Sequence, residues 1–158
     1  MSICLTHPHA VKPHVDADGP FQPLVRRWPT AVGVVATGVS LSVLAPLPEP
    51  VRTWVTAWWL LVAAVVYLAW GTARRQLGQR RWLTAQTAGV LAFAGIAIAA
   101  VAADLDTARY VLAAGWIAHA AWDLVHHHHD RVVPRWYAEA CMVVDLCLAT
   151  LLLTVGLV

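Results

Sequence analysis

Five apolar segments, separated by short polar ones, follow one another along the chain after residue 30. They cover residues 31–47, 51–70, 82–103, 107–125 and 134–158. A helix rises about 1.5 Å per residue and needs about 17–25 apolar residues to cross the hydrocarbon core of a membrane, so each segment has a spanning length. The pattern predicts an all-α fold: a polytopic membrane protein built as a bundle of five transmembrane helices.

Helix-breaking and helix-capping residues mark the ends of these segments. Prolines within residues 46–50 close the first segment, because proline cannot continue a helix. Gly71 follows the second segment, where glycine is a common C-cap. We expect Asp106 to cap the exposed amides at the start of the fourth segment.

The first 30 residues differ from the rest of the chain. They are polar, rich in proline and histidine, and contain no apolar core of the signal-peptide type. Such a composition is typical of a segment that does not pack into a core. We therefore expect two regions: a flexible cytoplasmic N-terminal tail over residues 1–30, and a helical membrane domain over residues 31–158.

The composition agrees with a membrane protein. Hydrophobic residues make up 59% of the chain and charged residues only 13%, with a mean hydropathy of +0.62. Soluble domains carry about a quarter charged residues. The net charge of +2, without a basic patch interleaved with aromatic residues, excludes nucleic acid as a partner. The expected partners are membrane lipids and a lipophilic small-molecule substrate, and a homo-oligomer stays open.

The lysines and arginines predict the orientation. Their counts in the successive polar segments are three, one, four, one and two, and the C-terminal end has none. High and low counts alternate, as the positive-inside rule requires for five spans whose first residue lies in the cytoplasm. We therefore predict insertion in the inner or plasma membrane with the N-terminus in the cytoplasm and the C-terminus outside.

The fourth segment carries a polar stripe. His119, Asp123 and His126 have the spacing i, i+4, i+7, which places them on one face of a helix. Ionisable side chains inside a membrane span are costly and are usually functional. We expect this stripe to face protein or water and not lipid.

The fifth segment adds two carboxyl groups. Asp145 lies about 14 Å from the cytoplasmic boundary and His119 about 10 Å, at 1.5 Å per residue, so an antiparallel helix pair places them near each other. Glu139 lies about 120° away from Asp145 on the helical wheel and closer to the cytoplasm. The stripe and Asp145 together predict a metal site formed by His119, Asp123, His126 and Asp145.

Three functions compete for this cluster. Imidazole and carboxylate ligands suit a divalent transition metal, zinc or iron, in an enzyme that hydrolyses or oxidises a lipid or lipophilic substrate. In that hypothesis Asp145 is a fourth ligand or the general base, and Glu139 either shuttles protons or orients a metal ligand through a hydrogen bond. Alternatively, His119 and Asp145 transfer protons or a metal cation across the membrane. In the third hypothesis the polar groups only fasten helices together in a scaffold subunit.

Overall fold

The computed structural model describes residues 27–155 of the chain. These residues form five helices and no strand: α2 (Trp28–Leu44), α3 (Glu49–Ala73), α4 (Arg80–Ala102), α5 (Leu105–His129) and α6 (Arg135–Val155). The prediction of an all-α fold is confirmed. The expected N-terminal tail lies largely outside the described residues, and α2 already begins three residues before the predicted boundary at residue 31.

Three of the helices are long and apolar enough to cross a membrane, namely Glu49–Ala73, Arg80–Ala102 and Arg135–Thr154. The helix α2 is apolar but has only 17 residues. The helix α5 has 25 residues, but it carries Asp106, Arg109, Asp123 and several histidines among its apolar side chains. Length and composition therefore support three of the five predicted spans, and the other two stay a prediction.

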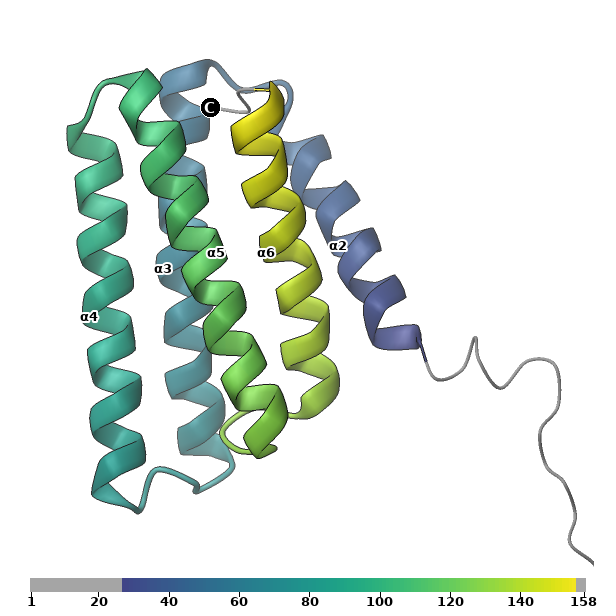
Figure 1. Ribbon diagram of the computed structural model, residues 1–158, viewed down its shortest axis with the longest axis vertical. Helices are drawn as coiled ribbons and strands as arrows, with labels where there is room; N and C mark the ends of the chain where they lie inside the picture. The colour runs from purple at the N-terminus through teal and green to yellow at the C-terminus, as the bar shows by residue number, and fades with distance from the viewer. Residues whose placement is uncertain (1–26, 156–158) are drawn as a thin grey trace, which may run out of the picture.

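Consecutive helices run in opposite directions (Figure 1). The α3–α4 loop (residues 74–79) and the α5–α6 loop (residues 130–134) consequently lie together at one end of the bundle. We call this end the arginine-rich end, because Arg74, Arg75 and Arg131 lie in its two loops. The α2–α3 and α4–α5 loops lie at the far end (Figure 1).

The helix α5 occupies the centre of the bundle, because it packs against α3, α4 and α6. The helix α2 packs against α6, on the side away from α3 and α4 (Figure 1). Leu60, Phe93, Leu112 and Leu148 are among the buried side chains of the core. Any side chain that α5 turns inward is therefore surrounded by helices, and this position explains how α5 can bury polar groups.

The start of α5 is capped by a different aspartate from the one predicted. The carboxylate of Asp104 accepts hydrogen bonds from the backbone N–H of Thr107 at 3.0 Å and from its hydroxyl at 2.8 Å. The helix begins at Leu105, two residues earlier than expected, so Asp106 lies within the first turn. There its negative charge still complements the positive end of the helix dipole.

Gly71 is also not a helix cap, because α3 continues to Ala73 and Arg74 occupies the C-cap position. Gly71 is instead a point of close packing. A Cβ atom there would lie 2.8 Å from Leu77 and 3.1 Å from Val132. The absence of a side chain lets the two loops of the arginine-rich end fold against α3.

Candidate metal centre

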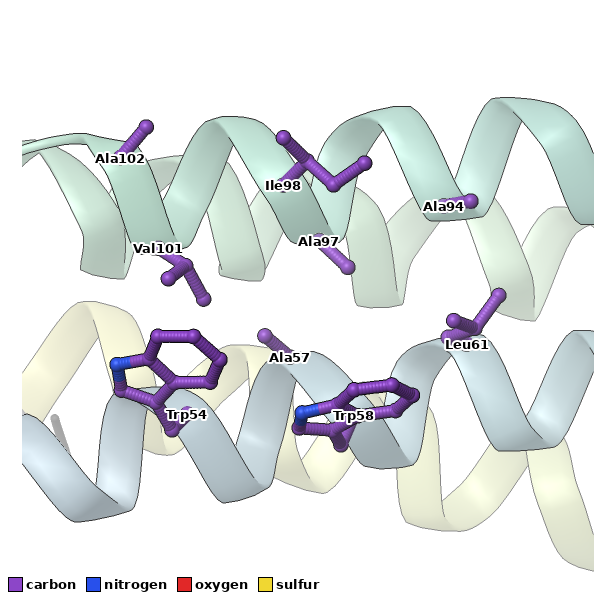
Figure 2. Close-up of a pocket in the computed structure, with 9 residues that line it drawn as sticks. All are labelled: Trp54, Ala57, Trp58, Leu61, Ala94, Ala97, Ile98, Val101 and Ala102. Atoms are coloured by element: carbon purple, nitrogen blue, oxygen red, sulfur yellow. The ribbon is translucent and has the colours of Figure 1, made fainter.

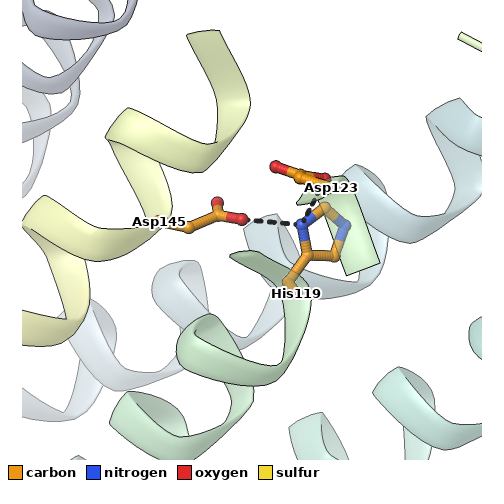
Figure 3. Close-up of side chains that lie close together, drawn as sticks. All are labelled: His119, Asp123 and Asp145. Atoms are coloured by element: carbon orange, nitrogen blue, oxygen red, sulfur yellow. Dashed lines mark hydrogen bonds and ion pairs between the residues drawn. The ribbon is translucent and has the colours of Figure 1, made fainter. Parts of the chain in front are cut away.

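Three buried side chains meet between α5 and α6. His119 and Asp123 come from α5 and Asp145 from α6, and one ligand atom from each lies within 4.8 Å of the others (Figure 3). The imidazole Nδ1 of His119 is 2.8 Å from Asp145 Oδ2 and 3.4 Å from Asp123 Oδ1. The three residues are 0%, 0% and 2% exposed. We call this group the His–Asp cluster.

Two features of the sequence produce the cluster. Residues 119 and 123 are one helical turn apart, so their side chains leave α5 on the same face. A short loop then reverses the chain, and α6 packs antiparallel to α5 and brings Asp145 alongside. The structure thus brings together three of the four residues in the predicted metal site.

Tyr67 is a member of the site that sequence reasoning missed. Its hydroxyl donates a hydrogen bond of 2.5 Å to Asp123 Oδ1 across the contact between α3 and α5. The side chain is 1% exposed, although it sits in a long apolar run. A hydroxyl inside such a run needs an internal hydrogen-bond partner, so a tyrosine within the apolar segment was the signal that the sequence offered.

Two polar atoms of the cluster have no hydrogen-bond partner among the described residues. They are Asp123 Oδ2 and His119 Nε2, and both are buried. Leaving a buried acceptor unsatisfied costs about 1–3 kcal/mol, and more for a charged group. A bound cation or an ordered water would remove that cost.

Aromatic side chains enclose the His119 ring. Its centroid lies 5.0 Å from that of Phe93, 5.5 Å from that of Tyr67 and 6.4 Å from that of Trp116. Tyr67 and Trp116 present their rings edge-on to the imidazole. This packing fixes the orientation of the imidazole and keeps bulk water away from the carboxyl groups.

His126 lies outside the His–Asp cluster. Its Nδ1–H donates to the carbonyl oxygen of Trp122 at 2.8 Å, because a carbonyl can only accept. In the resulting neutral tautomer Nε2 accepts from the Gln86 amide, also at 2.8 Å. Both ring nitrogens therefore have hydrogen-bond partners, and His126 connects α5 to α4.

Glu139 also has a different partner. Its carboxylate accepts a hydrogen bond of 2.6 Å from the Thr30 hydroxyl, at the contact between α2 and α6. Glu139 precedes Asp145 by six residues, which is about 9 Å along the axis and a different face of the helix. The structure does not bring Glu139 to the His–Asp cluster.

The donor set suits a divalent transition metal. One imidazole nitrogen and two carboxylates are ligands that zinc, iron and manganese accept. Tyr67 would then orient Asp123, as hydrogen-bonding partners of metal ligands commonly do.

Comparisons with known proteins add no further constraint: no protein-family model, curated protein or solved structure matches this chain.

Proposed function

We propose that this chain is an integral membrane protein that binds one divalent transition metal ion, zinc or iron, at His119, Asp123 and Asp145. The observation that carries the proposal is the His–Asp cluster itself, in which three buried side chains have ligand atoms within 4.8 Å of one another. The two carboxyl groups come from different helices, so a bound ion would also connect α5 to α6.

The charge of the cluster favours a dication. Two ionised carboxylates in a buried, water-poor site are very unfavourable unless a counter-charge neutralises them. A divalent ion supplies that counter-charge, and the imidazole binds it as a neutral ligand. The unpartnered Asp123 Oδ2 provides an additional lone pair close to the ligand atoms.

The proposal places the cluster inside the membrane. Asp145 lies ten residues into α6 from Arg135, about 15 Å along the helix axis. We propose that all five helices span the inner or plasma membrane with the arginine-rich end in the cytoplasm. The support is the alternation of lysine and arginine counts together with the position of the α3–α4 and α5–α6 loops at the same end (Figure 1).

An enzymatic role on a lipophilic substrate requires the substrate to approach the ion. The groove between α3 and α4 that Figure 2 shows is apolar, with Trp54, Trp58 and Ile98 among its lining residues. None of the three cluster residues lines this groove or the polar cavity at the arginine-rich end. We therefore propose ion binding alone as the function.

A second candidate function, transfer of protons or a cation, is favoured by a different observation. Buried polar atoms without partners among the described residues occur on both sides of the cluster. Thr56 Oγ1 and Trp116 Nε1 lie on the side of the far end, and Trp82 Nε1 lies on the side of the arginine-rich end. Buried polar atoms of this kind are the usual sites of internal water, and a chain of waters can carry protons.

Metal analysis of the detergent-purified protein tests the proposal. We expect about one zinc or iron ion per chain, either as purified or after reloading of chelator-treated protein. The variants His119→Ala and Asp145→Asn should lose the ion and keep their helical circular dichroism. The matched control is His126→Ala, a histidine of the same helix whose ring nitrogens are engaged elsewhere, and it should retain the ion.

Wild-type protein that neither contains nor takes up a transition metal would overturn the proposal. Protein that binds metal equally well in the His119→Ala and His126→Ala variants would also overturn it, because the ion would then lie elsewhere. Proton movement in proteoliposomes that depends on Asp145 but not on added metal would support the second candidate function.

A further inference from the structure

A polar cavity lies at the arginine-rich end, and no residue of the His–Asp cluster lines it. It has a volume of about 430 Å³ and opens between the α3–α4 loop and the α5–α6 loop. Its lining includes two arginines, Arg75 and Arg131, together with the side chains of Gln79 and His129. We call it the loop cavity.

The loop cavity carries an excess of positive charge. Arg75 and Arg131 are permanently charged, and the one carboxylate in the lining, Asp130, is paired at 3.6 Å with Arg135, which does not line the cavity. The side chain of Gln79, the N-cap residue of α4, makes no capping hydrogen bond. Its carbonyl oxygen accepts from the N–H groups of Trp82 and Leu83, so only the N–H groups of Arg80 and Arg81 precede the hydrogen-bonded turn. The amides at a helix start attract anions.

The loop cavity is held in shape by contacts across the two loops. The backbone N–H of Val132 donates to the Gln76 side-chain oxygen at 2.7 Å. The Arg131 guanidinium lies 5.8 Å from the centre of the Trp82 ring, on which it stacks as a cation–π contact. These two contacts pre-organise the cationic lining before any ligand binds.

Non-glycine residues with positive φ are concentrated around the loop cavity. Within residues 27–155 they are Arg75 at 54°, Asp130 at 49° and Val132 at 71°. Two of the three line the cavity. Such backbone conformations cost free energy and are retained where the surrounding structure or a ligand requires them.

We propose that the loop cavity binds the phosphate headgroup of an anionic phospholipid, with Arg75 and Arg131 as its principal contacts. The chemistry recognised is a phosphate monoanion beside two guanidinium groups. A lipid is the source to which the location points, because α3, α4 and α6 are long and apolar enough to span a membrane and the cavity lies at their ends. Basic pockets at the cytoplasmic ends of helices bind such headgroups. The inference goes beyond the proposed metal site and depends only on insertion in the membrane.

Native mass spectrometry of the full chain in a neutral detergent tests the inference. Phosphatidylglycerol, phosphatidylcholine and inorganic phosphate are titrated separately. We expect saturable binding of phosphatidylglycerol, with much weaker binding of the other two. Arg75→Gln and Arg131→Gln should each weaken phosphatidylglycerol binding about fivefold, and the double variant should weaken it about thirtyfold. These factors follow from the usual contribution of one arginine to binding at an anionic lipid surface, counted once for each substitution.

The matched control is Arg80→Gln. Arg80 is an exposed arginine at the same end of the bundle, and it does not line the loop cavity. Its substitution removes the same charge and should leave binding unchanged. An equal loss of binding in Arg80→Gln would overturn the proposal, because it would mean attraction to a diffuse basic surface.

Two other outcomes also overturn the proposal. If phosphatidylcholine binds as tightly as phosphatidylglycerol, the site does not recognise the net charge of the headgroup. Inorganic phosphate that binds as tightly as the lipid and competes with it would make the ligand a free anion. Metal content measured on the same samples keeps this test separate from the proposed function, because the arginine variants should retain the ion at His119, Asp123 and Asp145.

Discussion

At the scale of single residues, Asp123 has the most demanding environment in the bundle. Its Oδ1 atom accepts a hydrogen bond from the Tyr67 hydroxyl and lies 3.4 Å from His119 Nδ1. Its Oδ2 atom has no hydrogen-bond partner among the described residues. The side chain is fully buried. The Tyr67 hydroxyl is a hydrogen-bond donor to this buried carboxyl group, so the hydrogen bond should contribute to the stability of the fold.

We predict that Tyr67→Phe destabilises the metal-free protein by about 1–3 kcal/mol, because Asp123 then loses its hydroxyl donor inside the core. Thermal unfolding in detergent measures the change. Tyr110→Phe is the control, because Tyr110 is exposed and its hydroxyl accepts from the half-buried Arg109. An equal effect of the two substitutions would mean that the hydrogen bond to Asp123 adds little.

Asp104 gives a prediction about pH. The hydrogen bonds from the backbone N–H and the hydroxyl of Thr107 lower the pKa of the Asp104 carboxyl below its ordinary value. A lowered pKa in the folded state means that the carboxylate stabilises the fold above its unfolded pKa of about 3.9, and that this contribution disappears as the pH falls further.

We therefore expect Asp104→Ala to lower the unfolding temperature at pH 7 and to have a diminishing effect below about pH 4. The hydrogen-exchange protection factors of the first turn of α5 in wild-type protein, which are corrected for the intrinsic pH dependence of amide exchange, should fall over the same acidic range. Asp106→Ala serves as the comparison, because Asp106 lies in the first turn and is not the N-cap residue. If the difference in unfolding temperature between the wild-type protein and Asp104→Ala stays constant down to pH 2, this account is contradicted.

At the scale of the helices, close packing depends on a few glycines. In α2 a Cβ atom at Gly33 would lie 2.6 Å from the carbonyl oxygen of Ala140 and 2.8 Å from the Cβ atom of Val143, both in α6. A backbone carbonyl in a helix cannot move aside easily. Gly33 therefore sets the distance at which α2 docks on α6, which is also the contact that joins Thr30 to Glu139.

We predict that Gly33→Ala destabilises the protein by about 1–3 kcal/mol, the usual cost of overpacking a close contact. Gly38→Ala is a matched control in the same helix, because nothing lies within 4 Å of its added methyl group. Alanine favours helix over glycine, so that variant should be neutral or slightly stabilised. Thermal unfolding of both variants checks the prediction, and equal loss in the two would show that the α2–α6 contact is not tight.

At the scale of the whole molecule, the arrangement of the loops makes the orientation testable. The loops 74–79 and 130–134 share one end, and the α4–α5 loop lies at the other (Figure 1). We predict that the arginine-rich end lies in the cytoplasm, because positively charged residues are retained there. The measurement is labelling of single cysteines in intact cells with a membrane-impermeant maleimide.

For this measurement Cys4, Cys141 and Cys147 are first replaced by serine or alanine. A cysteine at Gly78 should be labelled only after the cells are opened, and a cysteine at Asp106 should be labelled in intact cells. The two positions serve as controls for each other. Labelling of Gly78→Cys but not of Asp106→Cys in intact cells would reverse the predicted orientation, and labelling of both in intact cells would contradict the spanning arrangement.

The sequence by itself determined the helices and one face of the site. Apolar runs bounded by prolines, glycines and arginines specify helices through local pattern, so the five helices lie close to where the pattern predicts them. The spacing of His119 and Asp123 is likewise a local property, because residues four apart on a helix share a face. The short loop after α5 predicts an antiparallel hairpin with α6, and this hairpin places Asp145 beside His119 and Asp123.

Only the tertiary structure decided which polar side chains hydrogen-bond to one another across different helices. His126 has the spacing of a ligand, yet it pairs with Gln86, forty residues earlier in the chain, because α4 packs against that turn of α5. Tyr67 reaches Asp123 from α3, and Glu139 pairs with Thr30 of α2, and neither contact leaves a trace in local spacing. Helical periodicity fixes the direction of a side chain around its own axis, whereas which neighbouring helix meets it depends on how all five pack.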